Sequence, residues 1–170
     1  MSDVTSEVTI RRARLGDREA AVALWAGLQA EHEALDGRHR PSASAQERWQ
    51  NDFREWVESE AHRVFVAEAG GVLVGLVTAH PYWPSPMYEQ ELEVYITELV
   101  VDPACRSGGV GARLVEAVRA WARAQGVTRI RTGVLSRNEG GRAFWRREGA
   151  EDFFTTVTLS VDGAAGPLGH

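Results

Sequence analysis

A glycine-containing loop lies between a β-prone run and an amphipathic segment, and this arrangement can bind an anion. The loop Arg106-Ser-Gly-Gly-Val-Gly-Ala112 follows the run LEVYITELVV and opens the helical pattern of residues 110–125. The first backbone N–H groups of a helix have no partner within the helix, and the helix dipole places partial positive charge there. Gly109 and Gly111 lack a Cβ, so a phosphate can approach the backbone. Taken alone, the loop fits a phosphate site and a plain strand-to-helix turn equally well.

Spacing excludes two common phosphate loops. A Walker A loop requires Gly-x-x-x-x-Gly-Lys-Ser/Thr, and no lysine follows Gly111. A dinucleotide fingerprint requires a third glycine where this sequence has Leu114, and it belongs to a βαβ unit near the start of a domain.

One carboxylate, Glu98, interrupts the otherwise apolar run VYITELVV. Burial raises the pKa of a carboxyl group, which suits it to act as a general base near neutral pH. The alternative is a strand carboxylate that faces solvent or pairs with an arginine such as Arg131. The strand pattern does not fix the face on which Glu98 lies.

The elements that must position these residues follow the order β-α-α-β-β-β-α-β-α-β. A first helix is expected to begin at Asp17. A capping box formed by Ser44 and Glu47 is expected to open a second helix, and Asn138 can cap the last one. Six runs are expected as strands: 8–14, the two arms of a hairpin within 63–80, 92–101, 127–135 and 152–161. This order predicts an α/β fold with a mixed sheet and helices on its faces.

Length and composition predict one soluble domain. The chain has 170 residues, of which 44% are hydrophobic and 25% charged. We expect a single domain over residues 1–161 and a disordered tail over 162–170. The sequence has no apolar run of about 20 residues and no signal-peptide pattern at its start, so we expect a cytoplasmic protein without a membrane partner.

Cysteine content and net charge limit the metals and partners that the protein is expected to bind. The one cysteine, Cys105, cannot form an internal disulfide, and clusters of Cys and His with metal-ligand spacing are absent, so no metal is expected. The net charge of −5 argues against a nucleic-acid partner and is compatible with a cationic small substrate.

The motifs resemble those of the GCN5-related N-acetyltransferase (GNAT) family. Its signature, Arg/Gln-x-x-Gly-x-Gly/Ala after a strand that ends in Val-x-Pro, is matched in register by Val101, Pro103, Arg106, Gly109 and Gly111. The segment VLSRNEGGRAFWRREGA is similar to the family's second CoA-contacting segment, with matches at 138, 144 and 149. The resemblance covers roughly residues 7 to 161.

The resemblance implies an acetyl-CoA-dependent N-acetyltransferase in which pantetheine inserts beside a splayed central strand. Glu98 would be the catalytic base for direct attack by a primary amine in a ternary complex. The implied acetyl-CoA contacts are Leu99, Val100 and Val101 with pantetheine and the thioester, Arg106, Ser107, Gly108, Gly109, Val110, Gly111 and Ala112 with the pyrophosphate, Asn138 with the pantetheine arm, and Trp145. A CoA-binding sensor or partner module without catalysis is the alternative.

Trp145 stands where the family usually has a tyrosine that is proposed to protonate the departing CoA thiolate. An indole N–H cannot act as an acid near neutral pH. Tyr82, Tyr88 and Tyr95 are the candidates to replace it. Strict alternation places Tyr95 on the face opposite Glu98 unless a bulge intervenes.

The acceptor is expected to be an amine-bearing small molecule or peptide. Six acids beside the expected substrate end could surround a cationic amine, or could form a solvated rim: Glu31, Glu33, Asp36, Glu89, Glu91 and Glu93. His32 is expected to be a partly buried histidine of the first helix, and a homodimer is possible.

Overall fold

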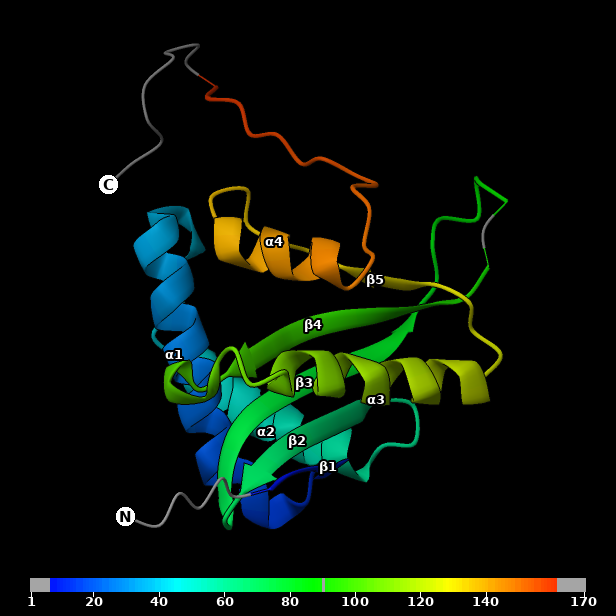
Figure 1. Cartoon of the computed structure of the whole chain (residues 1–170). Coiled ribbons are helices and arrows are strands. Elements are labelled where there is room, and N and C mark those ends of the chain that lie inside the picture. Colours follow the sequence, from blue (N-terminus) through cyan, green and yellow to red (C-terminus); the bar gives the residue numbers. More distant parts are fainter. Residues whose placement is uncertain (1–6, 90, 162–170) are drawn as a thin grey trace.

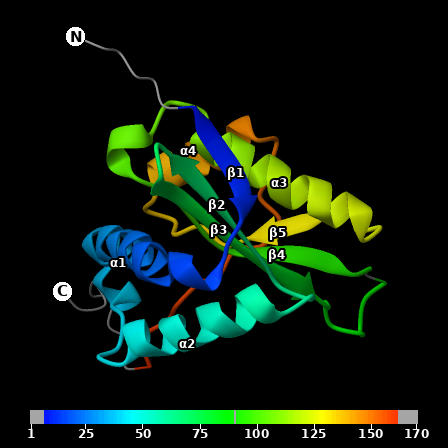
Figure 2. The same cartoon turned by 90° about the horizontal axis from the view of Figure 1, so that it is seen from below.

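Five strands form one mixed sheet in the order β1-β2-β3-β4-β5, with helices on both faces (Figures 1 and 2). The computed structural model describes residues 7–89 and 91–161. Its strands and helices are β1 Val8–Arg12, α1 Arg18–Leu35, α2 Ala45–Glu58, β2 Arg63–Ala69, β3 Val72–Tyr82, β4 Glu93–Val101, α3 Val110–Ala124, β5 Ile130–Thr132 and α4 Glu139–Arg147. The α/β fold with a mixed sheet is therefore confirmed.

Each face of the sheet has its own apolar core. On one face, α1 and α2 pack through Trp25, Trp49 and Phe53 against β2, β3 and β4 (Figure 2). On the other face, α3 packs through Leu114 and Val118, as the spacing of its apolar residues predicts. These two layers fix the position of β4 between them.

β4 is splayed from β5, as the family resemblance implies. The two strands are parallel and pair only over Val94–Ile96 and Ile130–Thr132. Beyond Ile96, β4 remains paired with β3 on one side but has no strand partner on the other within the described residues. The free side begins immediately before Glu98.

A β-bulge lies at the point where the splay begins. Thr78 of β3 pairs with Glu98, whereas the next residue, Ala79, pairs with Ile96, so Thr97 is the extra residue. A bulge shifts the alternation of side chains along its strand. The faces of residues before and after Thr97 therefore cannot be read from strict alternation.

Three expectations about local structure need correction. Helix α2 begins after Ser44, but the Ser44 side chain does not cap it, because the ψ of Ser44 is 3° rather than extended and its hydroxyl accepts a bond from Arg48 instead. β5 spans three residues rather than the run 127–135. Residues 152–161, expected as a last strand, form no strand pairing with other described residues, and the expected tail 162–170 lies outside the described residues.

Candidate active site

One large cavity of about 1060 Å³ lies between α1, β4, the loop before α3, and α4. Glu98 and every residue predicted to contact acetyl-CoA line this cavity, with the exception of Gly108. The lining members are Glu98, Leu99, Val100, Val101, Arg106, Ser107, Gly109, Val110, Gly111, Ala112, Asn138 and Trp145. Segments that are far apart in sequence thus meet around one space that can hold an extended ligand.

The loop presents the N-terminus of α3 to this cavity. Gly109 is the residue before the helix and has a φ of 74°, a conformation that favours glycine, and no side chain caps the helix. The first N–H groups of α3 are therefore available to an anion. A glycine is needed at position 111 for a different reason. A Cβ there would lie 3.0 Å from Cε2 of Phe144, so the glycine permits close packing of α4.

Arg106, expected at the pyrophosphate, bridges the loop to its neighbours in this structure. Its Nη2 lies 2.6 Å from Oε1 of Glu31 on α1, and its Nε donates to the Val101 carbonyl at 3.0 Å. The guanidinium lines the cavity but is engaged by a carboxylate.

Glu98 lies on the cavity wall with both carboxylate oxygens engaged by neutral donors. Nε1 of Trp49 on α2 donates to Oε1 at 3.2 Å, and the Thr78 hydroxyl on β3 donates to Oε2. The Glu98 backbone N–H in turn donates to Oγ1 of Thr78 at 3.1 Å. These bonds orient the carboxylate without supplying a positive charge.

Burial raises the pKa of Glu98, and the nearby Asp52 carboxylate acts in the same direction. The hydrogen bonds from Thr78 and Trp49 oppose this shift but do not cancel it. The alternative of pairing with Arg131 is wrong, because Arg131 donates to Glu93 at 2.7 Å. Glu98 is thus a carboxylate whose affinity for a proton is enhanced, at the edge of a ligand-sized cavity.

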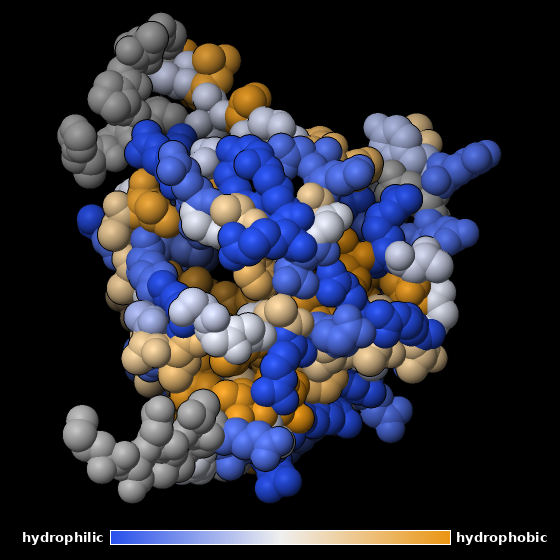
Figure 3. All heavy atoms as spheres, in the orientation of Figure 1, coloured by the Kyte–Doolittle hydropathy of each residue, from blue (hydrophilic) through white to orange (hydrophobic). Residues whose placement is uncertain are grey.

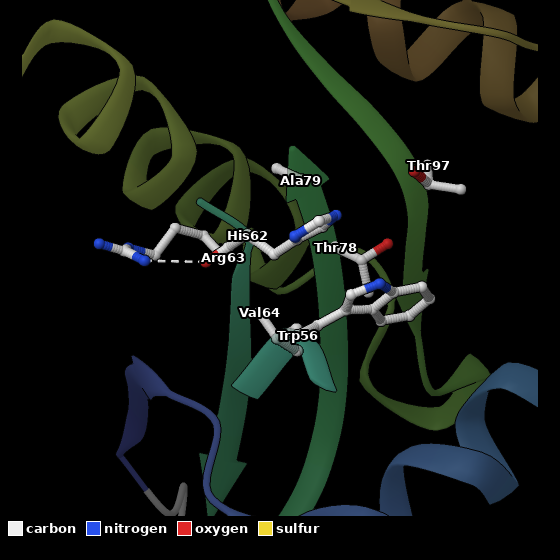
Figure 4. A pocket seen from close by; sticks show the side chains of 7 residues that line it. All are labelled: Trp56, His62, Arg63, Val64, Thr78, Ala79 and Thr97. Atoms are coloured by element: carbon white, nitrogen blue, oxygen red, sulfur yellow. Dashed lines mark hydrogen bonds between the residues drawn. The ribbon is translucent and has the colours of Figure 1, made fainter. Parts of the chain in front are cut away.

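A second, small cavity lies near the bulge and has room for about one water molecule (Figure 4). Its volume is about 10 Å³. The residues around it come from α2, the start of β2, β3 and β4, and they are Trp56, His62, Arg63, Val64, Thr78, Ala79 and Thr97. Thr97 lines both cavities, so the bulge separates them.

The bulge decides among the candidate tyrosines. Because Thr97 is the extra residue, Tyr95 lines the same large cavity as Glu98. Its hydroxyl lies close to Gly133, where an added Cβ would be 3.0 Å away. Tyr82 and Tyr88 are not among the residues that line the cavity. Strict alternation would separate Tyr95 from Glu98, and the bulge is the exception under which that separation does not hold.

Asn138 caps α4 as predicted, and its partner explains a departure from the family pattern. Its Oδ1 accepts a bond from the Gly141 N–H at 2.8 Å. A Cβ at position 141 would lie 2.7 Å from Nδ2 of Asn138. Glycine in place of the usual alanine thus leaves room for the capping amide. Trp145 lines the cavity and packs edge-on against Phe144 with ring centroids 5.1 Å apart.

Arginines form ion pairs with four of the six acids that were expected around a cationic amine. The ion pairs are Glu31 with Arg106, Glu33 with Arg40, Asp36 with Arg38, and Glu93 with Arg129 and Arg131. None of these acids except Glu31 lines the cavity. The expected ring of free carboxylates is therefore not formed by these four residues.

The α1 side of the cavity is lined by Leu28, Gln29, Glu31 and His32, and His39 joins them from the turn that follows α1. The two imidazole rings meet edge-on with centroids 5.3 Å apart. Burial and the neighbouring His39 lower the pKa of His32. His32 is half-buried, as expected, but its position on the cavity wall had no clear signal in the sequence.

Trp49 and Thr78 are the functional neighbours that sequence reasoning missed. Trp49 has the pattern of a core residue of α2, and Thr78 that of a hairpin strand residue. Only the register of β3 on β4 and the packing of α2 bring them to Glu98. The polar atoms of a tryptophan and a threonine in apolar runs were the available signal.

Comparison with known proteins agrees with this geometry. The family model described as the acetyltransferase (GNAT) family matches residues 28–150, and the chain belongs to this family. An uncharacterised N-acetyltransferase of Methanocaldococcus jannaschii is 28% identical over 106 residues. That match covers 62% of this chain and 46% of the relative, so the chain spans about half the relative's length.

Solved structures share the fold over nearly their whole length. A tetramutant of a Bacillus halodurans protein has a TM-score of 0.79 at 24% identity, and the match covers 90% of this chain and 99% of that one. The aminoglycoside N-acetyltransferase AAC(6')-Iy in complex with CoA has a TM-score of 0.74 at 18% identity, with 94% and 98% covered. At these identities the likeness establishes the fold.

Within the described ranges, no helix has both the length and the apolar character needed to cross a membrane.

Proposed function

We propose that the protein transfers an acetyl group from acetyl-CoA to a primary amine by direct attack in a ternary complex. The observation that carries this proposal is the position of Glu98. A carboxylate with a raised pKa stands beside the free side of β4 and shares one cavity with the uncapped N-terminus of α3. Family membership supports acetyl transfer in general.

The residues around the cavity fit acetyl-CoA, whose reactive part is an acetyl thioester. The loop 106–112 and the N-terminus of α3 would hold the pyrophosphate. The unpaired side of β4 at Leu99–Val101 would offer backbone groups to the pantetheine amides, because no strand occupies that side. Asn138 and Trp145 would contact the pantetheine arm from α4.

Glu98 would prepare the amine. An alkylammonium has a pKa of about 10.4, so the attacking nitrogen must first lose a proton. Glu98 accepts that proton, directly or through a water molecule, and its raised pKa improves it as an acceptor. A backbone N–H of Leu99 or Val100 would stabilise the oxyanion that follows attack.

Tyr95 is our candidate to protonate the departing CoA thiolate. Its side chain lines the cavity, whereas an indole at Trp145 cannot supply an acidic proton. The thiolate has a pKa near 8.5, so it can also leave without this help. The tyrosine is thus expected to accelerate the reaction modestly.

We infer that the acceptor is a small molecule with few positive charges. Two structural neighbours are named as aminoglycoside acetyltransferases, and aminoglycosides carry several amino groups. In this chain, arginines neutralise Glu31, Glu33 and Asp36, and the α1 side of the cavity carries two imidazoles and Leu28. This lining is better matched to a monoamine with an apolar part.

The test has two readouts in the same sample. Thermal denaturation with and without acetyl-CoA measures binding, because a ligand at 100 times its Kd adds about 2.7 kcal/mol to the free energy of unfolding. Release of free thiol in the presence of monoamines and polyamines then measures transfer. No melting shift contradicts the donor site, and preference for polyamines contradicts the acceptor class.

The second candidate is a CoA-binding module without catalysis, which the tryptophan at position 145 favours. It predicts a melting shift with acetyl-CoA and no thiol release from any amine. Trp145→Tyr would then be the variant to examine, because it restores the residue usual in the family.

A further inference from the structure

Thr78 connects the Glu98 carboxylate to the small cavity of Figure 4. Its hydroxyl donates to Oε2 of Glu98, and Thr78 also lines the small cavity, which Glu98 does not. His62 borders the same cavity from the turn between α2 and β2, and Figure 4 shows its ring extending toward Thr78. The volume of about 10 Å³ suits a single water molecule, to which Thr78, Thr97 and His62 offer polar partners.

The number of protons that Glu98 must handle follows from the proposed function, on which this inference rests. An alkylammonium loses two protons when its nitrogen becomes that of an amide. The first must leave before attack, because its bond occupies the lone pair, and the second leaves after attack, when the nitrogen of the tetrahedral intermediate is positively charged. Glu98 takes both in turn, whereas Tyr95 gives one proton to the thiolate and later regains one from solvent. The balance is one proton released per turnover.

Glu98 must release the first proton while both substrates are bound. A carboxylate that already holds a proton cannot take a second one, so the first must be discharged before the intermediate loses its own. The large cavity opens on the face shown in Figure 3, where the surface is hollowed between α1 and α4. Acetyl-CoA and the amine would fill that opening and exclude bulk water from it. The proton therefore needs a route that does not pass through the large cavity.

The hydroxyl of Thr78 has the bonding capacity for such a route. It donates to Oε2 of Glu98 and accepts from the Glu98 backbone N–H at 3.1 Å, which leaves one of its two acceptor sites for a water molecule. Once Glu98 is protonated, the carboxyl donates to Thr78, and the hydroxyl hydrogen must turn to another acceptor. A water molecule in the small cavity can accept it.

We propose that Thr78, one water molecule in the small cavity and His62 carry the first proton of the amine from Glu98 to solvent. The O–H bond of the carboxyl breaks as Thr78 receives the proton, and Thr78 passes its own hydrogen to the water. The water passes a proton to an imidazole nitrogen of His62, which releases one to solvent. Burial lowers the pKa of His62, so the imidazole is neutral near neutral pH and has a lone pair available. His62 is half-buried, so it reaches solvent as well as the cavity.

A neighbouring histidine provides a matched control. His80 on β3 meets the His62 ring edge-on with centroids 5.6 Å apart, and burial lowers its pKa as well. His80 lines neither the small cavity nor the large one. Phenylalanine at either position keeps a ring against its neighbours. His62→Phe and His80→Phe therefore disturb packing to a similar degree, but only His62→Phe removes a nitrogen from the small cavity.

The test compares two acceptors of similar size, benzylamine and phenylhydrazine, with acetyl-CoA and each variant. Benzylamine is an ammonium near neutral pH and must lose two protons, whereas phenylhydrazine is neutral and loses one, which Glu98 can keep until the products leave. We expect His62→Phe to lower kcat for benzylamine by roughly fivefold, less than the loss of the base itself, because the small fraction of amine that binds already neutral bypasses the relay. KM, the melting shift with acetyl-CoA and kcat for phenylhydrazine should stay unchanged. His80→Phe should behave as the wild type does.

Two outcomes would overturn the relay and leave acetyl transfer intact. The first is an equal loss with both amines, which would show that His62 acts through packing, and the second is an unchanged rate with benzylamine. A wild type that acetylates neither amine contradicts the proposed function itself, and the relay with it.

A second variant tests the same path if His62→Phe does not fold. Val64→Ile adds a methyl group at the small cavity, which should displace the water while His62 stays in place, and it should slow benzylamine selectively. A crystal structure of the wild type with no water between Thr78 and His62 would overturn the proposal.

Discussion

Two glutamates on the same strand, Glu93 and Glu98, have opposite environments. Glu93 is 1% exposed and accepts bonds from Arg131 at 2.7 Å and Arg129 at 3.1 Å. Glu98 accepts bonds from Trp49 and Thr78, and no Lys or Arg pairs with it among the described residues. One end of β4 thus holds a carboxylate with two cations, and the other holds one with neutral donors.

The pKa values respond in opposite directions. Burial alone would raise the pKa of Glu93, but the bonds from Arg131 and Arg129 outweigh it and the pKa is lowered. Burial dominates at Glu98 and the pKa is raised. Glu93 is therefore suited to link β4 to β5, and Glu98 to exchange a proton at the cavity. The partners, rather than the residue type, decide the role.

Glu98→Gln should produce the largest change, because the amide cannot accept the proton of the amine. We expect the amine-dependent rate to fall by about 10²–10⁴-fold, the usual contribution of a general base. Acetyl-CoA binding, measured by the melting shift, should be retained. An unchanged rate would remove Glu98 from the mechanism.

Glu93→Gln should act on stability instead. Breaking a buried ion pair lowers the free energy of unfolding by about 3–5 kcal/mol. We expect a loss of about 3 kcal/mol here because the Arg129 side chain is 63% exposed. Urea denaturation measures the loss. Since the pKa of Glu93 is lowered, the pair stabilises the fold above the ordinary glutamate pKa and the effect fades as the pH falls. A difference between wild type and variant that grows in acid would contradict the assignment.

Gly109→Ala tests the proposed acetyl-CoA site, which would bring the thioester to Glu98. The new Cβ projects from a left-handed position at the start of α3, and we expect acetyl-CoA affinity to fall about tenfold through loss of one hydrogen bond to a charged group. Gly149→Ala is the matched control, with a φ of 85° and open space around it, outside the cavity. Equal affinities for the two variants would contradict the phosphate site.

Thr78→Val should give the smallest effect and the most specific one. The Thr78 hydroxyl lowers the pKa of Glu98, so its removal should raise that pKa further. Glu98 must be ionised to accept a proton, and the rate therefore falls as the pH drops through its pKa. We expect the acidic limb of the pH–rate profile to move to higher pH. A limb that stays in place would show that another group controls it.

The sequence predicted the elements that depend on local pattern. The helical periodicity of α3, the hairpin about Gly70-Gly71 and the Asn138 cap are confirmed, because each depends on residues within a few positions. The glycine loop 106–112 and Glu98 were also identified as candidate site residues from local sequence pattern. Local pattern also predicted a strand at 152–161, but a strand requires a partner edge, which local pattern does not report.

The environment of Glu98 could not be predicted, since it depends on long-range register. Its partners Thr78 and Trp49 are 20 and 49 residues away in sequence. The bulge at Thr97 also moved Tyr95 to the cavity, against strict alternation. The arginine partners of the acids in α1 came from loops and turns whose side chains follow no periodic rule.

Glu98 is expected to hold its proton more tightly than an ordinary glutamate, whereas Glu93 on the same strand holds it less tightly. Titration of the glutamate carboxyl groups by ¹³C NMR measures this directly, with Glu98→Gln and Glu93→Gln to assign the two signals. We predict that the signal lost in Glu98→Gln titrates above the ordinary glutamate pKa, and that the signal lost in Glu93→Gln titrates below it. A Glu98 signal at or below the ordinary value would contradict the account.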